Sequence, residues 1–281
     1  MSRIDALRTG ELAGVEQRSV EDHLRKCSSC DESVDDVRQL AKALKGLALA
    51  PPRALRDALR LADSYDELDG VWVAFSDRGI RLIHKGSFEE FQALYAKRYG
   101  AALERRTIPE ELKRQVAAAR SGEAVQKPKL DVESRSELEA AVVAALRTIP
   151  RGEVRSYSWL AQQVGRPKAV RAVANFVAGN IVPYLVPCHR VVPAGGGVGK
   201  YAYGSSAKRE LLRREGVDVD ALDALARQHV RFIGSKTTHI FCFPTCRDAR
   251  RIREENRVPF HDTGDALKKG FRPCRRCLPA A

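Results

Sequence analysis

The chain has 281 residues, 44% of them hydrophobic, which is enough for two or three domains with their own cores. No apolar run approaches the roughly 18 residues that span a membrane, and the N-terminus lacks the apolar segment of a signal peptide. Most of the seven cysteines stand in short CxxC-like spacings rather than as a disulfide framework. We therefore expect a reduced, cytoplasmic protein.

The positive charge of the chain lies where its motifs lie. The formal net charge is +13 and the sequence pI is near 9.6. Residues 1–69 carry 11 basic and 14 acidic side chains, whereas residues 70–226 carry 25 against 17 and residues 227–281 carry 13 against 5. This balance favours a polyanionic partner, and we expect nucleic acid rather than a membrane surface.

Residues 1–50 are predicted to be helical, because apolar residues recur there at a period near 3.6. They contain His23-x3-Cys27-x2-Cys30, which suits zinc but supplies only three of the usual four ligands. The motif resembles the zinc-binding signature of anti-sigma factor zinc domains, and two ordinary helix cysteines are the alternative. We expect a small zinc or redox module with an unknown protein partner, then a linker or short helix over residues 51–69.

Residues 70–130 are expected to form a small layer of strands and helices. Two short apolar runs, at 71–75 and 80–83, flank a turn that ends in Gly79, and this pattern predicts a β-hairpin. Two helical patterns follow, at residues 87–99 and 110–119.

The next region has the pattern of a helix-turn-helix. A helix is expected to start at Ser134, with Glu137 completing a capping box. Ser156 is expected to cap the following helix and Gly165 to end it. Pro167 suits the first turn of a second helix, whose apolar stripe consists of small residues. Such a pair favours DNA binding, with an ordinary pair of core helices as the alternative.

The residues that most suggest chemistry are Pro187-Cys188-His189-Arg190. A free thiol with a pKa of roughly 8.5 is mostly protonated at neutral pH, and a neighbouring imidazole or guanidinium changes that. Taken alone, a buried core cysteine is the alternative. The glycine-rich segment 195–200 superficially suggests a phosphate-binding loop, but no Ser or Thr follows its lysine. No nucleotide cofactor is therefore expected.

This stretch resembles the active-site signature of the O6-alkylguanine-DNA alkyltransferases (methylated-DNA–protein-cysteine methyltransferases). Similar blocks stand upstream, in LRTIPRGEVRSYSWLAQQVGRPKAVRAVANFVAGN, and downstream, in GVGKYAYG and KRELLRREG. The resemblance implies an α/β N-terminal subdomain over residues 70–130 and a winged helix-turn-helix-like catalytic domain over residues 131–217. It also implies single-turnover DNA repair, in which a flipped O6-alkylguanine, or O4-alkylthymine, gives its alkyl group to Cys188.

The resemblance also implies catalytic roles for individual residues. Glu215 would orient His189, and the imidazole would take the proton of Cys188 through a water. Asn180 would tie the cysteine and histidine segments together by hydrogen bonds. Tyr157 would sit over the flipped base and help to protonate it.

Further residues match positions that the family uses for DNA and the substrate pocket. Arg171 would fill the gap that the flipped nucleotide leaves in the duplex. Tyr201 and Lys208 would line the pocket and support its loop, and Arg190 would brace the site or meet phosphate. The family often has a serine where this chain has Ala202, so only the backbone N–H could serve there.

The C-terminal region 218–281 carries a second constellation of cysteines. The pairs Cys242-x3-Cys246 and Cys274-x2-Cys277, with a helix-like stretch between them, form a strong four-cysteine zinc signature. The stretch resembles the metal-binding domain of the bacterial adaptive-response (Ada) protein. That resemblance implies that Cys242 accepts methyl groups from methyl phosphotriesters in DNA. A zinc ribbon that only tethers the protein to DNA is an equal alternative.

Together these features predict an α/β multidomain protein: a helical segment, an alkyltransferase region and a four-cysteine zinc domain. We expect it to act as a monomer on alkylated double-stranded DNA, with zinc as its metal. One alternative is a lesion binder without methyl transfer, a class expected to lack the acceptor Cys188. Another is a zinc-dependent regulator that senses alkylation or redox state through its terminal cysteine modules.

Overall fold

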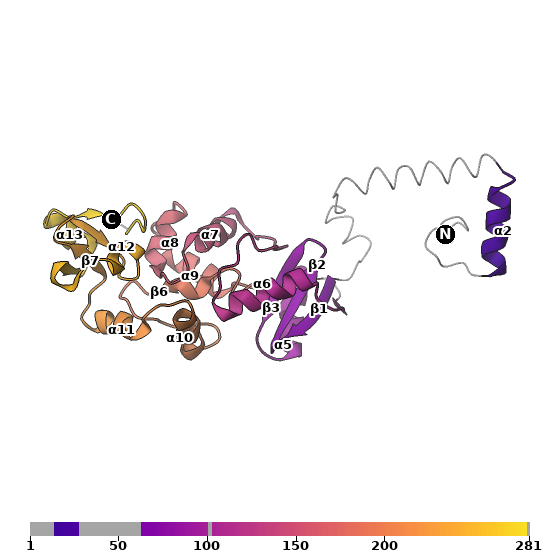
Figure 1. Cartoon of the computed structure of the whole chain (residues 1–281), viewed down its shortest axis with the longest axis horizontal. Helices are drawn as coiled ribbons and strands as arrows, with labels where there is room; N and C mark the ends of the chain where they lie inside the picture. Colours follow the sequence, from indigo (N-terminus) through magenta and orange to yellow (C-terminus); the bar gives the residue numbers. More distant parts are fainter. Residues whose placement is uncertain (1–13, 28–62, 101–102, 280–281) are drawn as a thin grey trace. The chain divides into compact units, whose positions relative to one another are not determined.

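The computed structural model of the chain describes residues 14–27, 63–100 and 103–279 (Figure 1). The chain divides into two compact units, residues 1–56 and residues 57–281. In the first unit the described element is helix α2 (Val15–Leu24), and the rest of the predicted helical segment lies outside the described residues. Within the described ranges, no helix is both long and apolar enough to cross a membrane.

A four-stranded sheet opens the second unit. In spatial order its strands are β3 (Gly79–His84), β2 (Val71–Ser76), β1 (Asp63–Leu68) and β4 (Leu103–Arg105). β2 pairs antiparallel with both β1 and β3, and β4 runs parallel to β1. The predicted β-hairpin is therefore confirmed as β2 and β3.

Strand β1 lies in the segment predicted to be a linker or short helix, and that prediction is wrong for residues 63–68. Its sequence, DSYDEL, is acidic, which hides the strand pattern. Asp63 is nevertheless buried, because it accepts hydrogen bonds from Arg81 of β3 and from Tyr95 of helix α5 (Phe88–Tyr99). These partners replace the water that the carboxylate loses on burial.

Helices α5 and α6 (Glu110–Ser121) form close to their predicted positions. The first begins with a capping box, in which Ser87 Oγ accepts from Glu90 N and the Glu90 carboxylate accepts from Ser87 N. It ends at Gly100, whose φ of 63° is the left-handed conformation that glycine adopts without strain. Phe91 then packs in a buried cluster with residues of β2 and β3.

The predicted helix-turn-helix is formed by α8 (Tyr157–Gln163) and α9 (Val170–Ala178). As predicted, Ser156 caps α8: its Oγ accepts from Trp159 N at 3.1 Å. The chain leaves the helix through Gly165, which has a φ of 69°. α9 begins three residues later than predicted, and Pro167 lies in the turn before it.

Helix α7 (Glu137–Thr148) precedes this pair, and its predicted start is corrected. The capping residue is Ser136, whose Oγ accepts from Glu139 N at 3.1 Å, rather than Ser134. The reason is geometric, because a cap must stand directly before the first helical residue. The Glu139 carboxylate accepts from the backbone N of Arg135 instead of from its capping residue.

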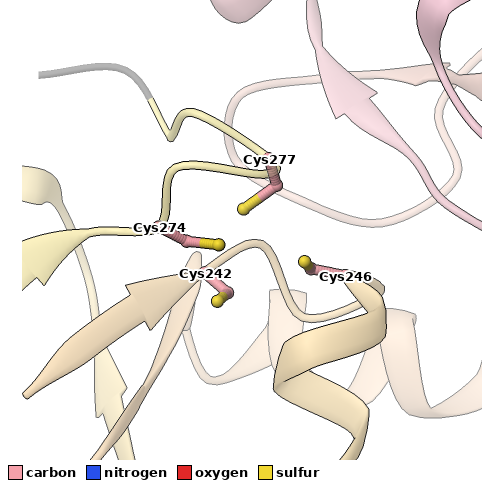
Figure 2. A group of neighbouring side chains, drawn as sticks. All are labelled: Cys242, Cys246, Cys274 and Cys277. Carbon is pink, nitrogen blue, oxygen red and sulfur yellow. The ribbon is translucent and has the colours of Figure 1, made fainter. Parts of the chain in front are cut away.

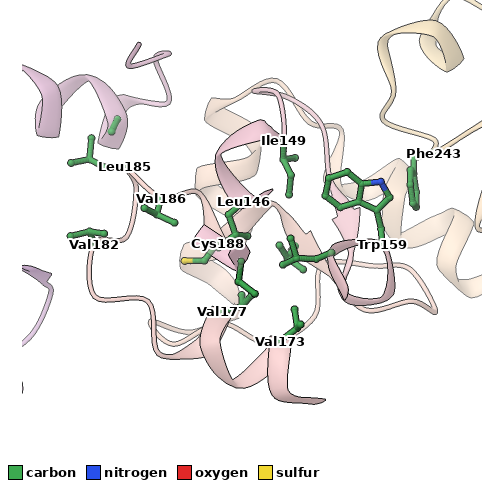
Figure 3. Close-up of a cluster of buried hydrophobic side chains, with 14 of the residues drawn as sticks. Leu146, Ile149, Trp159, Val173, Val177, Val182, Leu185, Val186, Cys188 and Phe243 are labelled. Atoms are coloured by element: carbon green, nitrogen blue, oxygen red, sulfur yellow. The ribbon is translucent and has the colours of Figure 1, made fainter. Parts of the chain in front are cut away.

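Two short strands, a 3-10 helix and an α-helix hold the cysteine motif in the core. They are strand β5 (Arg155–Ser156), the 3-10 helix η1 (Cys188–Arg190), strand β6 (Val191–Val192) and helix α10 (Ser205–Arg214). β5 and β6 pair in parallel, so the start of α8 lies beside the strand that follows Cys188. Apolar side chains from α7, α8 and α9 pack in the same buried cluster as Cys188 (Figure 3).

The C-terminal part is a second small sheet with helices. Its elements are α11 (Val219–Arg227), β7 (Phe232–Ser235), β8 (Ile240–Cys242), α12 (Arg247–Arg250), η2 (Glu254–Asn256), β9 (Arg257–Phe260), α13 (Thr263–Lys268) and β10 (Arg272–Pro273). The strands lie in the order β10-β8-β7-β9. The helix-like stretch expected at residues 248–255, between the cysteine pairs, is thus only a four-residue helix and the start of a 3-10 turn.

Candidate active site and metal centre

Cys188 is the first residue of η1 and is 6% exposed. Asn180 Nδ2 lies 3.1 Å from its Sγ and donates to the Val186 carbonyl at 2.9 Å. The other end of the amide, Asn180 Oδ1, accepts from Val182 N at 3.2 Å. The Asn180 side chain therefore fixes residues 182–186, which lead to the cysteine, and also points an N–H at the sulfur.

The environment of Cys188 opposes and favours ionisation at once. Burial raises the pKa of the thiol, while the hydrogen bonds with Asn180 and Tyr201 and the charge of Lys208 act to lower it. Tyr201 Oη lies 4.0 Å from the sulfur. Because burial prevails, the resting group is a thiol, and a base must take its proton before it reacts.

His189 is buried directly beside the cysteine in sequence, and its Nε2 lies 2.9 Å from Glu215 Oε1. Burial lowers the pKa of His189, although Glu215 opposes this shift, so the imidazole is neutral at physiological pH. Within the described residues its Nδ1 has no hydrogen-bond partner. If Nε2 carries the proton for Glu215, Nδ1 keeps its lone pair and is free to act as a base.

Arg190 closes this arrangement from the other side. Its Nε donates to Glu215 Oε2 at 2.8 Å and its terminal nitrogens donate to Glu215 Oε1 at 2.7 Å and to the Ile149 carbonyl at 2.6 Å. Burial alone would raise the pKa of Glu215, but the hydrogen bonds from His189 and Arg190 lower it to about 2. Of the two roles considered for Arg190, the geometry therefore favours bracing over phosphate contact.

Lys208 lies on α10 and is almost completely buried. Its Nζ donates to the Val191 carbonyl at 2.6 Å and to the Lys200 carbonyl at 3.4 Å, so it ties β6 to the glycine-rich loop. Burial lowers the pKa of Lys208 to about 8, with Cys188 opposing the shift. At neutral pH the side chain is thus largely cationic, which helps to lower the pKa of the cysteine.

The remaining predicted residues are half-buried or exposed. Tyr157 is the first residue of α8, where burial raises its pKa and the proximity of Cys188 raises it further. Arg171 on α9 and Ala202 are exposed. Tyr184, which the sequence patterns did not single out, is a non-glycine residue with a φ of 71°, and burial raises its pKa. Only its place in the cysteine segment could have pointed to it.

The four C-terminal cysteines converge (Figure 2). Cys242 ends β8, Cys246 precedes α12, and Cys274 and Cys277 follow β10. All four are buried and their sulfur atoms lie within 4.8 Å of one another. Zn–S bonds of about 2.3 Å place the corners of a tetrahedron about 3.8 Å apart, so the donor set fits zinc. This cluster is a zinc site.

A basic cavity of about 720 Å³ adjoins the zinc site. Cys242 and Cys274 contribute to its lining, and so do five arginines: Arg251, Arg253, Arg272, Arg275 and Arg276. The zinc ligand Cys242 therefore lines a cavity whose arginine side chains attract anions.

The N-terminal zinc motif stays a prediction. His23 lies in the last turn of α2, and Cys27 N donates to the His23 carbonyl at 2.9 Å just beyond the helix. Cys30 lies outside the described residues. The three predicted ligands are therefore not seen together.

These features define two centres, a buried cysteine with a histidine–glutamate pair and a four-thiolate zinc site. Residues 137–217 match the family "6-O-methylguanine DNA methyltransferase, DNA binding domain", and residues 221–280 match "Metal binding domain of Ada". These matched parts are similar to the two families that the sequence motifs indicated, an alkyltransferase domain and an Ada-type zinc domain.

Known proteins match parts of the chain. The bifunctional transcriptional activator/DNA repair enzyme Ada of Escherichia coli is 36% identical over 163 residues, which is 56% of this chain and 46% of that protein. The human methylated-DNA–protein-cysteine methyltransferase is 51% identical over 71 residues, 25% of this chain and 34% of that protein. This chain therefore spans less than half the length of either relative. The crystal structure of Mycobacterium tuberculosis O6-methylguanine methyltransferase aligns with a TM-score of 0.45 and 27% identity, over 55% of this chain and 92% of that one.

Proposed function

We propose that this protein repairs DNA by moving an alkyl group irreversibly from the O6 atom of alkylguanine to Cys188 Sγ. The observation that carries the proposal is the convergence of a buried thiol, an amide donor and a neutral imidazole paired with an ionised glutamate. Transfer to sulfur needs a thiolate only at the moment of reaction, and the base, His189, directly follows the thiol, Cys188, in the buried helix η1.

The proposed step balances as a displacement. A water bridging to His189 Nδ1 carries the Cys188 proton to the imidazole, whose charge Glu215 stabilises. The sulfur lone pair forms the new S–C bond while the C–O6 bond breaks, and Tyr157 supports proton delivery to the leaving guanine. The same displacement serves O4-alkylthymine. The product thioether is a very poor leaving group, so each molecule acts once.

Alkylated duplex DNA is the proposed partner. The base must leave the stack to reach a buried sulfur, and flipping costs a few kcal/mol that contacts in the duplex must offset. Arg171 is exposed on the second helix of the helix-turn-helix, where it is available to fill the gap. The net positive charge supplies the attraction to the backbone.

Mass spectrometry of the intact protein and its peptides tests this proposal after incubation with excess duplex containing O6-methylguanine. We expect one added methyl group on the Cys188 peptide, none in Cys188→Ala, and normal transfer in the control Cys27→Ala. No transfer by the zinc-loaded, DNA-bound protein would reject the proposal and favour a lesion binder or a regulator.

A second acceptor at Cys242 is supported by the basic cavity that this zinc ligand lines. A four-thiolate zinc site carries a formal negative charge, so a ligand sulfur stays nucleophilic without a base. We propose that a methyl phosphotriester enters this cavity and that the Cys242 sulfur attacks its methyl carbon. The new S–C bond forms while the methyl C–O bond breaks, and a phosphodiester anion is left in the DNA backbone. Incubation with duplex carrying methyl phosphotriesters should add a methyl to the Cys242 peptide. Its absence at full zinc occupancy would leave a purely structural zinc.

A further inference from the structure

The zinc loop, residues 242–247, packs directly on the strand that leads into the helix-turn-helix. Val154 N donates to Thr245 Oγ1 at 2.9 Å, and Arg247 N donates to Glu153 Oε1 at 3.1 Å. Thr245 stands immediately before the zinc ligand Cys246, and Arg247 immediately after it. Two backbone N–H groups, one from each side, are therefore satisfied across this contact.

A buried ion pair completes the contact. Arg155 pairs with Glu153, both side chains are almost fully buried, and Arg155 also donates to the Val154 carbonyl at 2.9 Å. The guanidinium carbon of Arg155 lies 5.2 Å from the ring centre of Phe243 and 5.7 Å from that of Trp159. Phe243 of the zinc loop therefore forms part of the wall that encloses this ion pair.

This contact leads to the reactive cysteine within a few residues. Arg155 and Ser156 form β5, which pairs with Val191 and Val192 of β6 directly after η1. Ser156 is also the cap of α8. A second link joins the same parts, since Arg231 donates to the Ala194 carbonyl just beyond β6.

We propose that the zinc domain is a positioning part of the alkyltransferase site, with Thr245 and Glu153 as the residues that transmit its order to β5, α8 and Cys188. The inference rests on the proposed transfer to Cys188. Zinc holds loop 242–247 in one conformation, the loop holds β5, and β5 fixes both the DNA-binding helices and the strand after the cysteine. Zinc loss or oxidation of its thiolates therefore slows repair at a sulfur that none of them touches.

A mere DNA tether makes a different prediction, and single-turnover kinetics separate the two. A tether raises affinity, so its loss is overcome by saturating DNA, whereas a positioning defect lowers the maximal rate. At saturating O6-methylguanine duplex we expect Thr245→Val to transfer about three- to tenfold more slowly and zinc-stripped protein at least about tenfold more slowly. Thr245→Ser, which keeps the hydroxyl, and Thr148→Val, on an exposed helix end, should keep the wild-type rate.

Amide hydrogen exchange of the full chain without DNA gives a readout independent of activity. Removing zinc should speed exchange at Val154 and across residues 153–160, and Thr245→Val should do so at Val154. Unchanged maximal rates and unchanged exchange would overturn the coupling. If zinc-loaded wild-type protein does not methylate Cys188 at all, the proposed function fails, while the exchange experiment still decides whether the zinc loop orders β5.

Discussion

His189 Nε2 and Glu215 Oε1 lie 2.9 Å apart in a buried contact, and both oxygens of that carboxylate also bind Arg190. The carboxylate therefore accepts hydrogen bonds from the imidazole of His189 and from the guanidinium of Arg190 at once, and these bonds keep it ionised. An ionised Glu215 accepts from Nε2–H and so selects the imidazole tautomer whose Nδ1 lone pair is available. The orientation of the base follows from this arrangement rather than from its place next to the cysteine in sequence.

Glu215→Gln should slow transfer to Cys188 about 10²-fold, because the amide no longer fixes the tautomer or stabilises the imidazolium. Single-turnover transfer from O6-methylguanine duplex measures this effect. Glu210→Gln, exposed on helix α10, which ends just before Glu215, is the matched control and should transfer normally. Equal rates for the two variants would mean that Glu215 is only structural.

The same residue predicts how stability depends on pH. The pKa of Glu215 falls from its usual 4.5 to about 2 on folding. A lowered carboxyl pKa contributes stability above about pH 4.5, and this contribution is lost as the pH falls through about 2. A shift of this size corresponds to roughly 3 kcal/mol at neutral pH. Urea unfolding of wild type and Glu215→Gln should differ by about that amount at pH 7 and converge toward pH 2.

Lys208→Met should make Cys188 a weaker nucleophile even without DNA. The change removes the cation that lowers the cysteine pKa and releases the carbonyls of Val191 and Lys200. We expect iodoacetamide to alkylate Cys188 about three- to tenfold more slowly at pH 7.5, with the thiol titrating at higher pH. Lys268→Met, at an exposed position on α13, is the control. An unchanged titration would show that the charge of Lys208 does not reach the sulfur.

Much of this architecture was predictable from local pattern. The hairpin needed only two apolar runs and a glycine turn, and the cap at Ser156 and the exit at Gly165 needed only their residue types. The zinc cluster followed from cysteine spacing, because paired ligands leave few ways to complete a tetrahedron.

The features that could not be predicted depend on contacts between residues far apart in the sequence. Strand β1 is acidic, and Asp63 becomes a core residue only because Arg81 and Tyr95 reach it from other elements. The contact between Glu153 and the zinc loop joins residues more than ninety positions apart. Local periodicity carries no record of such pairs, so neither β1 nor the docking of the zinc loop could be predicted.

Arg171→Ala should lower the rate of transfer at saturating DNA about tenfold, because nothing then holds the gap left by the flipped base. The side chain is exposed, so the free energy of unfolding should change by less than about 0.5 kcal/mol. If Arg171 acts as a wedge, the salt dependence of binding stays the same. A slope reduced by about one with a normal maximal rate would instead make it a phosphate contact. Arg227→Ala, exposed at the end of α11, is the control.

Cys246→Ser should remove the zinc of the C-terminal domain and unfold the sheet that it closes. The sulfur is fully buried and supplies one corner of the tetrahedron, and zinc binding in such small sites is worth on the order of 10 kcal/mol of folding free energy. Metal analysis should find one zinc fewer per chain, and a thermal scan should show a lower transition temperature. His23→Ala should leave this zinc in place, because His23 belongs to the other compact unit, residues 1–56. A full zinc content in Cys246→Ser would mean that three thiolates suffice, since the remaining cysteines would then hold the ion with a water or an acidic side chain as the fourth ligand.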